Sequence, residues 1–201
     1  MRESSKNDNI RQLKYAERGF IARSANALFL RAIQEMLPKQ TVSRILDVGC
    51  GEGVPLLQVG SMSKKVQLVG FDLDLDRVQL GRDNISSALL FVANAHHIPF
   101  PDATFDIVMC LETLEHVGEP MISVTEIARV TKRYALFSVP NEPWWRFANM
   151  ARLKYLRDFG NTPGHINHWT YSGFRDLISS RFRIVEQRHP FLWNFILAEK
   201  M

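Results

Sequence analysis

Residues 45–53, Ile-Leu-Asp-Val-Gly-Cys-Gly-Glu-Gly, decide the fold of this chain. The first part is mostly apolar, which is typical of a strand buried on both faces of a sheet. Gly49, Gly51 and Gly53 follow at alternating positions. Glycine lets the backbone turn sharply and approach a ligand with no side chain between them. The stretch therefore predicts a buried strand that leads into a ligand-binding loop.

The spacing of these glycines argues against a dinucleotide site. The dinucleotide fingerprint needs G-x-G-x-x-G, whose third glycine would fall on Val54. Here the spacing is D-x-G-x-G-x-G, and it begins at Asp47. The stretch instead resembles motif I of the class I S-adenosylmethionine (SAM)-dependent methyltransferases, in which this loop holds the amino-acid end of SAM.

Three later segments resemble the same family in the same order. They are Val-Gly-Phe-Asp-Leu-Asp at 69–74, Ala-Asn-Ala-His-His-Ile-Pro-Phe-Pro-Asp-Ala-Thr-Phe-Asp at 93–106, and Ile-Val-Met-Cys-Leu-Glu-Thr-Leu-Glu-His-Val at 107–117. Four motifs at the expected spacing are far more specific than one glycine-rich turn.

Apolar patterning predicts alternating strands and helices, and hence a mostly parallel sheet that ends in an antiparallel pair. The resemblance implies a Rossmann-like α/β fold: a seven-stranded mixed sheet in the order 3-2-1-4-5-7-6, its last strand antiparallel, with helices on both faces. We expect one domain over 1–201, with a helical cap at 10–37 and an insertion at 141–169 that roofs the acceptor pocket. The expected strands after the first are 66–71, 88–93, 105–110, 134–139, 182–186 and 192–199, and the expected helices are 54–60, 74–84, 120–131 and 171–180.

Asp72 is the expected ribose ligand. It ends the second strand, and an acid there can accept hydrogen bonds from both ribose hydroxyls. Asp74 and Asp76 are better explained by the first turn of a helix, where carboxylates complement the helix dipole. Asn94 stands where the family usually has an aspartate that binds the adenine amino group, and its side-chain oxygen can still accept. The resemblance implies cofactor contacts from Asp47, Gly49, Cys50, Gly51, Gly53, Asp72, Leu73, Asn94, Ala95, Cys110 and Leu111.

The expected catalytic groups are Glu115, His116, His165 and His168. If residues 112–116 begin a helix, Glu112 and Glu115 share one face, and a late histidine can complete the set. The pattern E-x-x-E-H with a later histidine resembles the metal-assisted O-methyltransferases of ubiquinone biosynthesis and small-RNA 3′-end modification. A similar Leu-Glu-His-Val also occurs in family members that use no metal. We expect no metal, with His116 as base; the alternative is a divalent ion held by Glu112, Glu115, His116 and His165.

The insertion combines aromatic and basic residues. On a helical wheel Trp144, Ala148, Ala151, Tyr155 and Phe159 share one arc, opposite Arg146, Lys154 and Arg157. This pattern suits a lid helix packed on its own domain, and equally a peripheral membrane contact through 143–160 or a lipid-like acceptor. Single-stranded nucleic acid is a weaker alternative, because no RNA-binding motif is present.

Composition is compatible with this interpretation. The chain has 201 residues and a formal net charge of +4, which permits an anionic partner without requiring one. Its two cysteines form no disulfide framework, and no apolar run reaches the ~18–20 residues of a membrane span, so a cytoplasmic protein is expected.

The expected function is methyl transfer from SAM to a small or lipid-like acceptor, including a hydroxyl, by a monomer or homodimer. The alternatives are a SAM-binding protein without catalysis, such as a sensor or inactive partner subunit, and an RNA-modifying methyltransferase. The acceptor atom is left open, since carbon, nitrogen and oxygen methyltransferases share these cofactor motifs.

Overall fold

The sheet has the expected order. The computed structural model describes residues 20–38, 42–61, 66–153, 155–190 and 192–201. Its seven strands run in the order β3-β2-β1-β4-β5-β7-β6, and β7 is antiparallel to both β5 and β6. This arrangement confirms the predicted fold class. The strands are β1 Arg44–Val48, β2 Gln67–Asp72, β3 Ala88–Val92, β4 Phe105–Leu111, β5 Thr131–Pro140, β6 Phe182–Arg188 and β7 Trp193–Lys200.

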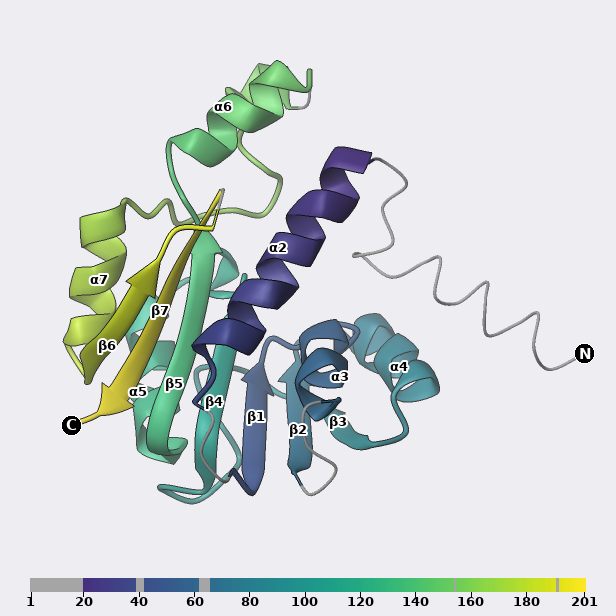
Figure 1. The fold of residues 1–201 in the computed structure, drawn as a ribbon, viewed down its shortest axis with the longest axis vertical. Helices are drawn as coiled ribbons and strands as arrows, with labels where there is room; N and C mark the ends of the chain where they lie inside the picture. Colours follow the sequence, from purple (N-terminus) through teal and green to yellow (C-terminus); the bar gives the residue numbers. More distant parts are fainter. Residues whose placement is uncertain (1–19, 39–41, 62–65, 154, 191) are drawn as a thin grey trace, which may run out of the picture.

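Helices cover both faces of the sheet, as alternating strands and helices require (Figure 1). One face packs against α2, α3 and α4, and the other packs against α5 and α7. Of the expected cap at 10–37, residues 10–19 lie outside the described residues, and α2 accounts for most of the rest. The helices are α2 Phe20–Met36, α3 Val54–Gly60, α4 Leu75–Asn84, α5 Pro120–Val130, α6 Trp144–Ala151 and α7 Tyr171–Ser179, with short 3-10 turns η2 Leu114–His116 and η3 Leu156–Asp158.

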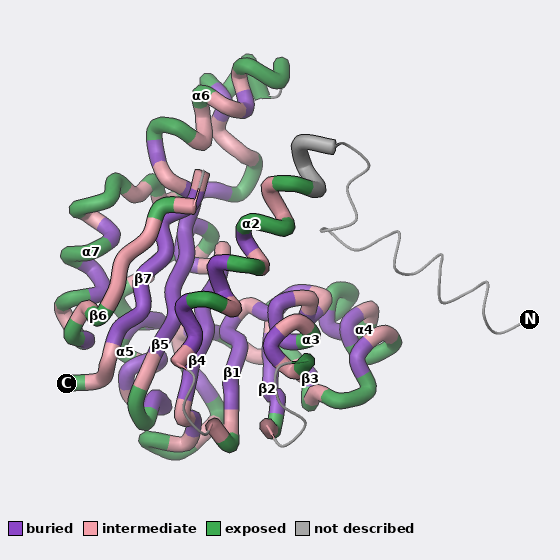
Figure 2. The backbone as a smooth tube through the Cα atoms, in the orientation of Figure 1, coloured by how far each residue is buried: buried purple, intermediate pink, exposed green. Residues whose placement is uncertain are grey.

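Strand β4 shows how the sequence builds two cores at once. Successive side chains on a strand point to opposite faces. Val108 and Cys110 therefore join the core under α5 and α7, whereas Met109 and Leu111 join the core under α2 and α3. Because both faces are covered, the central strands are almost continuously buried (Figure 2).

The glycine-rich loop bends between the ends of β1 and β2. Gly49, Gly51 and Gly53 all have positive φ, a conformation that is costly for residues with a Cβ. The N–H groups of Gly49 and Cys50 both donate to the Phe71 carbonyl at 2.9 Å. A Cβ on Gly49 would lie 2.3 Å from Oγ1 of Thr113. Glycine is therefore required at Gly49 by packing as well as by conformation.

The insertion departs from the expected continuous helix. Helix α6 ends at Ala151, and Leu153, Tyr155 and Phe159 all have positive φ. The chain then folds back along α6, where Arg146 Nε donates to the Phe159 carbonyl at 3.0 Å and Asn149 Nδ2 to the Gly160 carbonyl at 2.9 Å. The expected arc from Trp144 to Phe159 therefore does not form, because hydrogen bonds within the insertion interrupt the helical period.

Candidate active site

A cavity of about 610 Å³ opens at the carboxyl ends of the central parallel strands. This is where open α/β sheets bind ligands, because the strand order reverses between β1 and β4. One end is lined by Gly49, Phe71, Asp72, Leu73, Asp74, Arg77, Ala93, Asn94 and Ala95; the other is lined by parts of α2, η2, α6 and the loop before α7.

Asp72 bridges the glycine loop and the start of α4. Its Oδ2 accepts from the Gly51 N–H at 2.8 Å, and its Oδ1 accepts from the Asp74 N–H at 3.0 Å. Asp74 caps α4 by accepting from the N–H groups of Asp76 and Arg77. Asp72 therefore lines the cavity in a fixed orientation, whereas the carboxylate of Asp74 is used by its own helix, as the sequence predicted.

Replacing Asp72 with alanine should weaken SAM binding by about 1.5–3 kcal/mol, the range expected when hydrogen bonds to a charged group are lost. Asp72→Asn keeps one acceptor oxygen, so its SAM binding should be weakened less. Asp76→Ala, on the exposed first turn of α4, serves as the control. Titration calorimetry gives the affinities, and an unchanged affinity in Asp72→Ala would remove Asp72 from the cofactor site.

The remaining expected cofactor residues divide into two groups. Leu73, Asn94 and Ala95 line the cavity, and the side-chain oxygen of Asn94 accepts from the His96 N–H at 2.9 Å. Cys50, Gly51, Gly53, Cys110 and Leu111 are buried and do not line this cavity. Burial raises the pKa of both thiols, which keeps them protonated.

Asp47 lies buried beneath the glycine loop. It is 1% exposed, and neither carboxylate oxygen has a hydrogen-bond partner among the described residues. Burial and then the nearby charge of Asp72 raise the pKa of Asp47 well above its ordinary value. A buried carboxyl of this kind destabilises the ligand-free protein when it ionises, unless a cation comes to it.

The stability of the ligand-free protein should therefore decrease as pH rises. The native state of Asp47 holds its proton over a range in which the unfolded chain, with a pKa of about 3.9, has already released it. Within that range this group should lower the free energy of unfolding by about 1.4 kcal/mol per pH unit. Asp47→Asn should flatten the dependence, and urea unfolding at a series of pH values would show it. Parallel curves for the two proteins would contradict the prediction.

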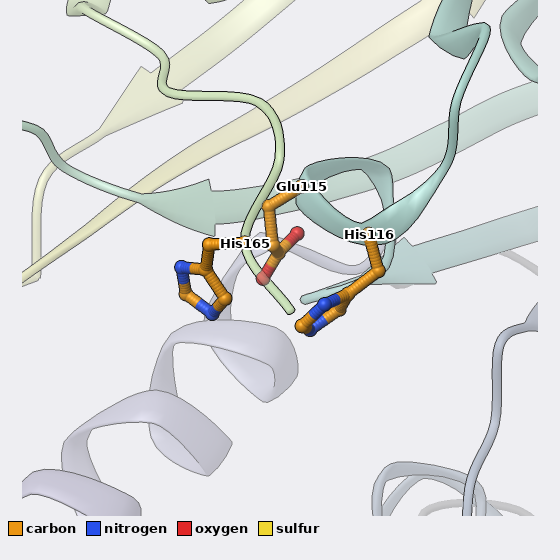
Figure 3. A group of neighbouring side chains, drawn as sticks. All are labelled: Glu115, His116 and His165. Carbon is orange, nitrogen blue, oxygen red and sulfur yellow. The ribbon is translucent and has the colours of Figure 1, made fainter. Parts of the chain in front are cut away.

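The acceptor end of the cavity brings together Glu115, His116 and His165, although His165 is far from the other two in sequence (Figure 3). One potential ligand atom from each side chain lies within 4.8 Å of the others. The two imidazole rings meet edge to face, with centroids 4.8 Å apart. Glu115 and His165 are buried, whereas His116 is exposed to the cavity.

Backbone hydrogen bonds hold the two segments together. The Glu115 carbonyl accepts from the N–H groups of Ile166 and Asn167, and Asn167 Nδ2 donates to the Leu114 and Val117 carbonyls. His116 Nδ1 lies 2.9 Å from the Gly164 carbonyl oxygen. Because a carbonyl only accepts, Nδ1 must carry the proton, and the lone pair of the neutral ring lies on Nε2. Residues 112–116 do not begin a helix; Glu112 has φ +53°, and η2 is a short 3-10 turn.

An aromatic wall completes this end of the cavity, and sequence analysis missed it. Trp145 stacks on His165 and packs against Trp193, which in turn packs against Phe29 of α2. Trp193 Nε1 donates to Glu112 Oε2 at 2.9 Å. Glu112 lines the cavity but is not part of the three-residue cluster. In the sequence only the adjacent Trp144 and Trp145 indicate aromatic residues near the acceptor, since Trp193 resembles an ordinary strand residue.

His168 does not join the other expected catalytic residues. It does not line this cavity, and its Nδ1 lies 3.7 Å from Glu142 Oε1. Asn167 is anchored to η2, so the chain carries the next side chain away from the cluster. Burial raises the pKa of Glu142, and His168 is the main group opposing that effect.

Residues 46–139 match the family model described as a methyltransferase domain. The chain is 31% identical to the 27-O-demethylrifamycin SV methyltransferase of Amycolatopsis mediterranei (strain S699), over 48% of this chain and 38% of that protein. It is 36% identical to the ubiquinone biosynthesis O-methyltransferase of Azoarcus sp. (strain BH72), over 44% of this chain and 40% of that protein. As the motifs predicted, residues 46–139 form a methyltransferase domain similar to those of SAM-dependent methyltransferases.

The similarity in fold extends well beyond the matched segment. Magnesium protoporphyrin IX methyltransferase from Synechocystis PCC 6803, solved with bound SAH, has a similar structure with a TM-score of 0.70. The two are 14% identical, and the match covers 98% of this chain and 94% of that one. The sequence matches to the two curated relatives above span less than half of their lengths. No helix among the described residues of this chain is long and apolar enough to cross a membrane.

Proposed function

We propose that this protein transfers the methyl group of SAM to a hydroxyl of a small or lipid-like acceptor. The observation that supports this most is that one cavity has a cofactor end formed by Gly49, Asp72 and Asn94 and an acid-base end formed by Glu115, His116 and His165. Both curated relatives described above are named as methyltransferases of small molecules, and one is an O-methyltransferase by name.

The residues of the first end fit the cofactor. The three glycines of the loop present backbone at positive φ without side chains, and Asp72 offers carboxylate oxygens to paired hydroxyls. The buried carboxyl of Asp47 would be neutralised by an ammonium group nearby, which suits the amino-acid end of SAM. When bound, SAM supplies a methyl group on a sulfonium, an electrophile that needs no further activation.

The residues of the second end would prepare the acceptor. A hydroxyl must lose its proton to become a good nucleophile, and Nε2 of His116 is the basic atom that the hydrogen bond to Gly164 leaves on that ring. Once His116 has taken up the proton, the carboxylate of Glu115 would stabilise the imidazolium by its charge, and the ring of His165 would hold it in place by contact. Trp145 and Trp193 would hold a flat or apolar acceptor and exclude water.

A divalent ion is the alternative use of the same three side chains. Carboxylate and imidazole are suitable ligands, and such an ion would lower the pKa of an acceptor hydroxyl. Ligands at about 2.0–2.2 Å from one ion lie at most about 4.4 Å apart, so atoms within 4.8 Å would need to close by a few tenths of an ångström. Treatment with a chelator separates the two versions: the metal-free proposal expects unchanged turnover, and loss of turnover with SAM binding retained would favour the metal.

The deciding experiment measures conversion of SAM to S-adenosylhomocysteine with a panel of phenols, catechols and lipid-linked quinols. Turnover with a hydroxylated acceptor is the expected result. Tight SAM binding with no turnover on any acceptor would favour a sensor or partner subunit. Turnover only with RNA would overturn the small-molecule acceptor. Light scattering on the same samples distinguishes a monomer from a homodimer.

A further inference from the structure

The outer surface of the insertion exposes large apolar side chains. We define the outer face as Trp144, Phe147, Leu153, Leu156 and Phe159, which are between 52% and 79% exposed. Among the described residues, the exposed aromatic side chains all lie between Trp144 and Tyr171. Solvent exposure of apolar groups on this scale is costly, and it marks interaction surfaces on soluble domains.

The outer face projects from the molecule. Helix α6 stands away from the sheet, beyond the carboxyl ends of its central strands (Figure 1). Trp144 and Phe147 pack side by side on α6, with ring centroids 6.1 Å apart. The hydrogen bonds from Arg146 to the carbonyls of Phe159 and Asp158 fix the returning segment beside α6. Apolar side chains from both segments are thus held on one small, protruding element.

The charge around the outer face indicates which kind of partner binds there. Residues 143–160 contain four basic residues and one acidic residue, Asp158. Arg157 is exposed in the described part of this segment, and Arg152, which is also exposed, lines the cavity. A two-fold interface through the same face would place this positive charge against its own copy, which disfavours self-association. Apolar groups with aromatic anchors in a segment of net positive charge instead match an anionic bilayer, where the rings lie at headgroup level and a basic side chain such as Arg157 reaches the phosphates.

We infer that the outer face docks on the surface of an anionic phospholipid bilayer. The inference rests on the proposed function, because the bilayer would be the source of the lipid-like acceptor. A different side of α6 carries Trp145, Ala148 and Asn149, which line the cavity. One short helix therefore faces the bilayer on one side and the acceptor end of the cavity on the other. A lipid-like acceptor would enter the cavity beneath α6 without crossing water.

Vesicle flotation tests the inference without any turnover. The protein should bind phosphatidylcholine vesicles that contain phosphatidylglycerol and should bind pure phosphatidylcholine vesicles weakly. The double substitution Phe147→Glu with Phe159→Glu should reduce binding at least about tenfold, because two aromatic anchors are removed. Arg157→Glu should reduce it about fivefold or more, the effect of losing about 1 kcal/mol per charge at the surface.

The matched control is Leu57→Glu, since Leu57 is 50% exposed on α3, away from α6 (Figure 1). All variants should keep the SAM affinity and melting temperature of the parent protein. Equal binding to both vesicle types, or binding that survives the double substitution, would overturn the inference. So would light scattering that shows an oligomer formed through the outer face. Failure of methyl transfer with vesicle binding intact would count against the proposed function alone.

Discussion

His116→Asn should lower kcat by about a hundredfold to ten-thousandfold, the contribution expected of a positioned general base. The asparagine amide can still donate to the Gly164 carbonyl, so the loop before α7 should stay attached to η2. What the variant lacks is the basic Nε2 atom in the cavity. SAM affinity should not change, since His116 lies at the acceptor end. The rate of S-adenosylhomocysteine formation at saturating substrate gives kcat, and calorimetry gives the SAM affinity.

His168→Ala is the control for this prediction, because His168 pairs with Glu142 outside the cavity. Its kcat should stay near that of the parent protein. In the parent protein kcat should also fall on the acidic side, because an imidazole that has taken up a proton cannot act as a base. That acidic limb should vanish in His116→Asn. Parental turnover in His116→Asn would exclude His116 as the base.

Gly51→Val should reduce SAM affinity by at least about a hundredfold while the protein stays folded, because a side chain would occupy the ligand's place in a loop that binds through its backbone. Gly51 has φ +52°, and the nearest atom to a Cβ there would be Arg77 Nη1 at 3.7 Å. The folded protein therefore has room for a Cβ, and the new side chain would point toward Arg77, which lines the cavity. Calorimetry and thermal unfolding measure the two effects separately.

Two further substitutions separate the causes. Gly51→Ala tests the strain of a positive φ alone, about 1–2 kcal/mol, without the γ carbons. Gly118→Val is the control, because a Cβ at Gly118 would have no neighbour within 4 Å. Parental SAM affinity in Gly51→Val would mean that the loop is only a turn.

The sheet, the turns of the glycine-rich loop and the position of Asp72 at a strand end were predictable from sequence. These features are local: strand periodicity, glycines that need positive φ and an acid at a strand end. Each depends on residues close together in the sequence and can therefore be recognised there. The roles of Asp74 and Asp76 also followed from local rules, since helix capping involves neighbours within one turn. The order of the strands came from resemblance to a family rather than from any single residue.

The insertion was predicted less well because tertiary hydrogen bonds override its helical period. Arg146 was assigned to a basic face, yet its side chain binds the returning backbone. That contact spans more than ten residues, and no local pattern encodes it. The result is that Trp145, and not Trp144, faces the cavity, while Trp144 points outward.

The sequence by itself therefore determined the α/β sheet, the glycine loop and the candidate groups at residues 112–116. Only the tertiary structure decided which histidine joins them. His165 and His168 are three residues apart, and composition cannot distinguish them. Asn167 fixes the loop to η2 through the carbonyls of Leu114 and Val117, which directs His165 toward Glu115 and His168 toward Glu142. The choice depends on contacts between segments about 50 residues apart, which arise only when the chain is folded.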